Sequence, residues 1–78
     1  MKARGDAKKM TLEELRLQAG WSRNELARQA GTDSGTVLKA LKGQLITIAT
    51  ADKLATAISR KLGRSIPWQT IEGLNVKV

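Results

Sequence analysis

Hydrophobic residues recur every three or four positions along most of the chain, and glycines interrupt this pattern at regular intervals. Such recurrence is typical of amphipathic helices, and each glycine marks a place where a helix can end. The pattern predicts five helices. They are expected at about residues 12–19, 23–30 and 34–42, from the capping residue Thr47 to Gly63, and from the segment Ser65-Ile66-Pro67-Trp68 to Gly73.

Capping residues support the predicted starts of the first three helices. Thr11-x-x-Glu14 and Ser22-x-x-Glu25 both match the capping box, in which the two side chains bond each other's backbone N–H groups. Asp33 is placed to cap the third helix by accepting from its first free N–H groups. Trp21 precedes the second capping box, and we expect it to pack near Leu26 and hold the start of that helix.

The last two predicted helices carry apolar faces that would close a core. We expect Pro67 to occupy a first helical position, where proline is tolerated. The apolar positions are Ile48, Ala51, Leu54, Ala55, Ile58 and Leu62 in the fourth helix, and Trp68 and Ile71 in the fifth.

Residues 22–43 have the layout of a helix-turn-helix: two short helices joined by a tight glycine turn, the second with lysines on its outer face. Gly31 can adopt the positive φ that ends the first of them and redirects the chain. Packing between the two helices would fix the angle at which the second projects. The expected contacts join Leu26, Ala27 and Ala30 to Val37, Ala40 and Leu41.

This stretch resembles the Cro and phage-repressor type of helix-turn-helix, the Xre-like family. The residues that carry the resemblance are Ser22-x-x-Glu25-Leu26-Ala27, Ala30-Gly31, Thr36-Val37, Lys39 and Gly43, and a weaker likeness extends from about residue 12 to 62. The resemblance implies an all-α, compact five-helix lambda-repressor-like domain whose second motif helix, about 34–42, lies in the major groove of DNA. It also implies sequence-specific binding of double-stranded DNA as a transcriptional regulator, acting as a homodimer on DNA.

The resemblance further implies which residues face the DNA. Gly35 costs helix stability, so it indicates either close approach of DNA or simple tolerance of glycine in a first turn. Leu38 could contact a thymine methyl, face a partner protein or turn partly inward. The expected base contacts are Ser34, Gly35, Leu38 and Lys39, and the expected phosphate contacts are Arg23, Asn24, Thr32, Thr36, Lys42 and Gln44.

Composition narrows the function classes further. The 78 residues suit one domain, and 14 Lys plus Arg against 7 Asp plus Glu give a net charge of +7, which favours polyanionic partners. No Cys and no His occur, so zinc fingers, thiol chemistry and imidazole catalysis are excluded. The carboxylates are scattered and no phosphate-binding glycine loop is present, so we expect neither an enzyme nor a cofactor, metal or small-molecule ligand. No stretch approaches the length of a membrane span, and a cytoplasmic protein is expected.

The two ends and one basic cluster leave alternatives open. Residues 1–10 are expected to form a flexible basic arm, either solvated or reaching around the duplex, and residues 11–73 the helix-turn-helix domain. Residues 74–78 form either a frayed tail or a short strand that pairs with its twin across a dimer. Basic residues 60, 61 and 64 either complement the helix dipole or contact DNA. The rival function is a protein-interaction module, antitoxin-like or an adaptor subunit, which would use Leu38, Trp68 and the C-terminal strand.

Overall fold

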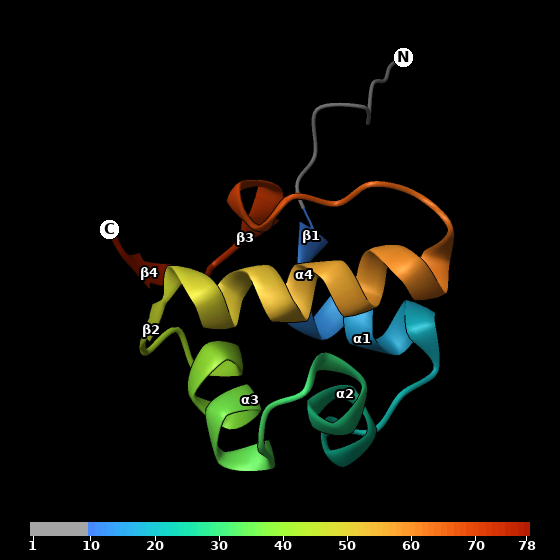
Figure 1. Ribbon diagram of the computed structural model, residues 1–78, viewed down its shortest axis with the longest axis horizontal. Coiled ribbons are helices and arrows are strands. Elements are labelled where there is room, and N and C mark those ends of the chain that lie inside the picture. Colours follow the sequence, from blue (N-terminus) through green and yellow to red (C-terminus); the bar gives the residue numbers. More distant parts are fainter. Residues whose placement is uncertain (1–9) are drawn as a thin grey trace.

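Four α-helices dominate the computed structural model, which describes residues 10–78 (Figure 1). They are α1 (Leu12–Ala19), α2 (Arg23–Ala30), α3 (Ser34–Leu41) and α4 (Ile48–Leu62). The predicted bounds of the first two are confirmed, and α3 ends one residue earlier than predicted because Lys42 serves as its C-cap. The predicted N-caps are present: the side chains of Thr11, Ser22, Asp33 and Thr47 each accept a backbone N–H three residues on. The capping box is complete at Thr11, whose N–H donates to Glu14, but not at Ser22, because the carboxylate of Glu25 accepts from Arg28 and Gln29 instead.

The predicted fifth helix is wrong. Only a single 3₁₀ turn, η2 (Trp68–Thr70), forms after Pro67, and the chain then becomes extended at Ile71, where φ is −87° and ψ is 118°. Too few residues separate Pro67 from Gly73 to repay the cost of nucleating an α-helix. Burial of Ile71 against the core is nevertheless confirmed, while Trp68 is half-buried beside it.

The expectation of an all-α fold also needs correction, because four short strands form two parallel, two-stranded sheets among the described residues. In one sheet β1 (Met10–Thr11) pairs with β3 (Ile71–Glu72). In the other β2 (Leu45–Thr47) pairs with β4 (Asn75–Lys77), with Ile46 opposite Val76. The domain is therefore mostly helical, and its C-terminal segment pairs through β3 and β4 with two earlier parts of the chain.

The C-terminal strand exists, but its partner is β2 of its own chain rather than a twin in a second molecule. Met10, which the sequence assigns to the end of the basic arm, lies in β1. The rest of the predicted arm, with its basic residues at positions 2, 4, 8 and 9, lies outside the described residues.

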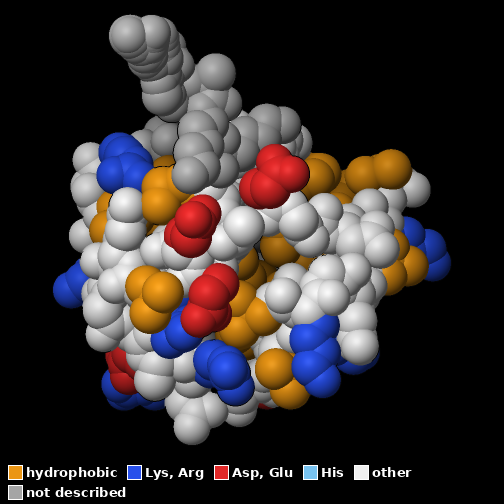
Figure 2. All heavy atoms as spheres, turned by 180° about the vertical axis from the view of Figure 1, so that it is seen from behind, with side chains coloured by type: hydrophobic (Ala, Val, Ile, Leu, Met, Phe, Trp, Pro, Cys, Tyr) orange, Lys and Arg blue, Asp and Glu red, His pale blue; other side chains and the backbone are white. Residues whose placement is uncertain are grey.

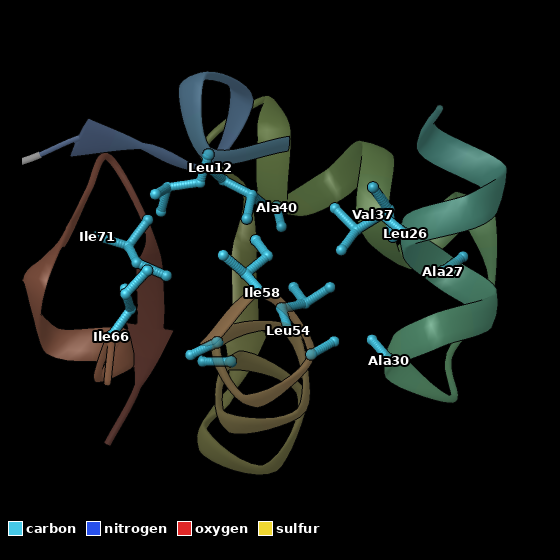
Figure 3. Packing of buried hydrophobic residues seen from close by; sticks show 14 of the residues in the cluster. Leu12, Leu26, Ala27, Ala30, Val37, Ala40, Leu54, Ile58, Ile66 and Ile71 are labelled. Carbon is cyan, nitrogen blue, oxygen red and sulfur yellow. The ribbon is translucent and has the colours of Figure 1, made fainter. Parts of the chain in front are cut away.

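The hydrophobic core lies between α4 and the other elements (Figures 1 and 3). Leu26 and Val37 face one another across the α2–α3 contact, and Leu54 and Ile58 meet them from α4 (Figure 3). Ile48 departs from the predicted apolar face of α4, because it is 44 % exposed at the first turn of the helix. The core also includes two residues that were not among the predicted apolar positions: Ile46, which precedes the predicted fourth helix, and Ile66, in the segment predicted to open the fifth.

The turn between α2 and α3 is built as predicted. Gly31 has φ of +74° and ψ of 32°, and its N–H donates to the carbonyls of Ala27 and Arg28. A Cβ at this position would meet no atom within 4 Å, so the conformation alone demands glycine. The turn sets α3 against α2, with further contacts to β2 and α1, while leaving its other side in solvent.

Candidate nucleic-acid interface

One side of α3 faces the core and the other faces solvent. Val37 and Ala40 are buried, and at 100° per residue the direction opposite to them corresponds to Gly35. Gly35 therefore lies at the centre of the outward face. The exposed residues on that face are Ser34, Gly35, Leu38, Lys39 and Lys42.

A shallow hollow of about 410 Å³ joins this face of α3 to the start of α2. The structure thus brings together four of the expected DNA contacts, Arg23 and Asn24 from α2 and Ser34 and Leu38 from α3. Leu38 is 37 % exposed and contributes an apolar wall. The lining residues are Arg16, Ser22, Arg23, Asn24, Ser34 and Leu38.

The start of α2 provides the positive end of the hollow. Ser22 caps the helix by accepting from the N–H of Glu25 at 3.0 Å, which leaves the N–H groups of the first turn directed outward. The exposed Arg23 adds a full positive charge beside them. A helix N-terminus with a neighbouring cation suits an anion such as a phosphate.

The start of α3, in contrast, carries a negative charge, that of Asp33. The Oδ1 atom of Asp33 accepts from the N–H of Thr36 at 2.7 Å, and this hydrogen bond, with a smaller contribution from the charge of Lys39, lowers the pKa of Asp33. Asp33 is therefore anionic at neutral pH, and its charge occupies the N-terminal end of α3. The first turn of α2 also carries a carboxylate, Glu25, but it accepts from Arg28 and Gln29, and Arg23 stands beside it with a positive charge. The start of α2 therefore suits a phosphate better than the start of α3, which leaves the outward face of α3 for other contacts.

Arg16 is a lining residue that the sequence analysis missed. Its guanidinium donates to both carboxylate oxygens of Glu13, at 3.1 and 2.5 Å, and to the carbonyl of Trp21 at 2.8 Å. These bonds tie the end of α1 to the loop that precedes α2, and the bond from Arg16 lowers the pKa of Glu13. The Glu13–Arg16 spacing of three residues is the signal that could have identified the pair.

The other predicted phosphate contacts lie outside the hollow. Thr32 is half-buried in the turn between α2 and α3, and Thr36 is half-buried on the flank of α3. Lys42 and Gln44 are exposed at the far end of α3, where the N–H of Gln44 donates to the carbonyl of Lys39 at 2.9 Å. The candidate contacts thus occupy both ends of the outward face.

The second basic cluster lies apart from this hollow. Arg60 and Lys61 line a separate depression together with Trp21 and Gln29, while Arg64 donates to Oε1 of Gln18 at 3.3 Å. Seen from behind, several basic side chains lie over the lower part of the molecule, where α2 and α3 lie in Figure 1, and others lie at its upper left and right edges; most of the acidic ones lie in the upper and middle part (Figure 2).

Comparison with protein families gives one match. A family model described as helix-turn-helix matches residues 12–69, which is most of the chain. The comparisons with curated proteins and with solved structures gave no match. Within residues 10–78, no helix is both long and apolar enough to cross a membrane.

Proposed function

The chain belongs to the Cro and phage-repressor type (Xre-like) helix-turn-helix family, and on that basis we propose that it binds specific sequences of double-stranded DNA as a transcriptional regulator. The observation that carries the proposal is the hollow that links the anion-attracting start of α2 to the outward face of α3. Such a surface can hold a phosphate of one strand while α3 enters the adjacent major groove.

In this proposal the outward face of α3 reads base edges. The ammonium of Lys39 donates to guanine O6 and N7, and the hydroxyl of Ser34 donates or accepts. Gly35 lets the helix approach closely, because it lies at the centre of the outward face and adds no side chain. Leu38 contacts a thymine methyl, for which its partly exposed apolar side chain is suited.

The flanking residues would position the domain on the sugar–phosphate backbone. Arg23 and Asn24 act at the start of α2, and the remaining contacts lie in the turn before α3, on its flank and beyond its end. These contacts add affinity without reading sequence. The proposed phosphate contacts are Arg23, Asn24, Thr32, Thr36, Lys42 and Gln44.

Two copies are proposed to act together on DNA in the cytoplasm. The eight residues of α3 extend over only about 12 Å at 1.5 Å per residue, so one copy reads only a few base pairs. A homodimer on two half-sites about one helical turn apart supplies the affinity that a single copy lacks.

The rival function, a protein-interaction module, loses two of its supports. Trp68 is half-buried against the core, and the C-terminal strand already pairs with β2 of its own chain. Both are therefore less available as a contact surface for another protein, whereas Leu38 is exposed on the outward face of α3.

Selection from a random duplex library at near-physiological salt tests the proposal. We expect an enriched, roughly palindromic sequence bound at least ~1,000-fold more tightly than scrambled DNA or matching RNA. Weak, salt-sensitive binding with no sequence preference would refute it.

Single variants then test which residues read the base sequence and which only bind phosphates. Lys39→Ala should lose about 1–3 kcal/mol on the selected site and relax the preference at one base pair, whereas Arg23→Ala should weaken all sequences alike. Lys61→Ala is the matched control, because it removes the same charge from a separate depression. Equal losses on selected and scrambled DNA for both test variants would contradict the assigned roles.

A further inference from the structure

A second depression, of about 330 Å³, lies between α2 and the C-terminal half of α4. Trp21 borders it from the loop before α2, and Gln29 borders it from the last turn of that helix. In Figure 1 the end of α4 lies beside the loop that leads into α2. We call this site the α2–α4 depression, and its lining residues are Trp21, Gln29, Ala57, Arg60 and Lys61.

The α2–α4 depression combines apolar surface with a basic edge. Ala57 is buried, and Trp21 is half-buried against the core, so part of the indole is accessible from the depression. Arg60 and Lys61 lie three and four residues beyond Ala57 in α4, and such neighbours share one face of a helix. Both are exposed. A ligand here would meet an aromatic side chain next to two full positive charges.

No carboxylate within residues 10–78 neutralises these two cations. The salt bridges of that region join neighbours on α1 or on α2, and neither includes Arg60 or Lys61. Glu25, one turn before Gln29, is held by Arg28 and by Gln29 itself. The C-terminal end of α4 carries about half a negative charge from the helix dipole, which offsets only part of the two positive charges. The depression therefore attracts an anionic partner.

We propose that the α2–α4 depression binds an acidic segment of a partner protein, an extended peptide in which carboxylates flank an apolar side chain. The carboxylates pair with Arg60 and Lys61, and the guanidinium can donate two parallel hydrogen bonds to one of them. The apolar side chain packs on Trp21 and Ala57. Nε2 of Gln29 already donates within α2, so its Oε1 is left to accept a peptide N–H.

The place and the lining of the depression favour a peptide over nucleic acid. It shares no lining residue with the hollow at α3, which uses the first turn of α2 where the depression uses the last. It also lies at the end of α4 remote from α3 (Figure 1). The proposed DNA contacts therefore leave its residues unused. Single-stranded RNA stacks on successive aromatic side chains, whereas Trp21 is the one aromatic residue of this lining.

Selection from a displayed library of random short peptides, with the full chain as bait at low salt, is the first test. We expect enriched peptides in which Asp and Glu flank a leucine or an aromatic residue. Because the chain carries a net charge of +7, any acidic peptide is attracted to it, so the place of binding must be tested separately. Failure to enrich acidic peptides would overturn the proposal.

Two double variants test the place of binding, since each removes two positive charges from exposed positions. Arg60→Ala with Lys61→Ala should weaken an enriched peptide about fivefold to tenfold, as expected for two exposed ion pairs, and leave binding of the selected duplex unchanged. Arg23→Ala with Lys39→Ala, the matched control, should weaken the duplex and leave the peptide nearly unchanged. Equal losses of peptide affinity in both double variants would show attraction to net charge alone and overturn the proposal.

Fluorescence gives a readout that does not depend on removing charge. The chain has two tryptophans, so Trp68→Phe leaves Trp21 as the single reporter. Addition of an enriched peptide should shift the emission of Trp21, and an unchanged emission at saturating peptide would contradict contact with the indole. A single-stranded oligoribonucleotide that is bound through Arg60 and Lys61 and displaces the peptide would assign the pair to nucleic acid, which would also overturn the proposal.

Discussion

Replacing Gly35 by alanine should stabilise the domain and weaken DNA binding at the same time. The residue is helical and exposed, and an added Cβ would have its nearest neighbour, Oδ1 of Asp33, at 3.5 Å, an ordinary contact. Nothing in the folded chain therefore requires glycine here. Because alanine restricts the unfolded chain more than glycine does, Gly35→Ala should raise the stability by about 0.5–1 kcal/mol.

The same methyl group would stand at the centre of the outward face of α3. If DNA approaches closely there, the methyl must displace the helix, at a cost typical of overpacking of about 1–3 kcal/mol, or roughly a 5- to 150-fold loss of affinity.

Thermal unfolding should show a melting temperature higher by a few degrees, and fluorescence anisotropy with the selected duplex should show the loss of affinity. A stabilised variant that binds as tightly as the unsubstituted protein would refute the close-approach interpretation. In that case glycine is merely tolerated in the first turn.

Three further predictions concern the scaffold. Gly31→Val should lower the stability by about 1–2 kcal/mol or more through its φ of +74°, and an unchanged melting temperature would contradict the observed turn. Leu54→Ala should cost about 2–5 kcal/mol in urea unfolding, since Leu54 is fully buried, whereas Leu17→Ala, 62 % exposed, should change it little. The hydrogen bond from Thr36 lowers the pKa of Asp33 below its ordinary 3.8, so this cap stabilises the fold above pH 3.8 and is lost as the pH falls through the lowered value. The melting temperatures of Asp33→Ala and the unsubstituted protein should therefore differ at pH 7 and converge well below pH 3.8; a constant difference would argue against the cap.

The helices could be predicted because their signals are local. Thr11, Ser22, Asp33 and Thr47 each bond a backbone group three residues away, so the sequence alone places the helix starts. The turn at Gly31 is equally local, since only its own φ demands glycine. The helix-turn-helix and its outward face follow from these signals together with helical periodicity.

The strands and the lining of the hollow depended on contacts between distant parts of the chain. Residues 74–78 alternate apolar and polar, so a short strand there was one of two alternatives, but its pairing with β2, Val76 opposite Ile46, could not be predicted. Pairing of Met10 with Ile71 joins two segments that carry no pattern strong enough to predict strands. These pairings make the segment after Pro67 extended where a helix was predicted. Arg16 bonds residues only three and five positions away, Glu13 and Trp21, but its place in the lining of the hollow depends on how the helices pack together.

The sequence by itself determined the four α-helices, their caps and which residues of α3 face outward, because each depends on neighbours within a few positions. Only the tertiary structure decided that α2 and α3 share one hollow, that the C-terminal strand pairs within its own chain, and that Leu45 and Ile48 remain exposed. The physical reason is that burial and strand pairing are properties of the whole packed chain, whereas helix formation and capping are largely local.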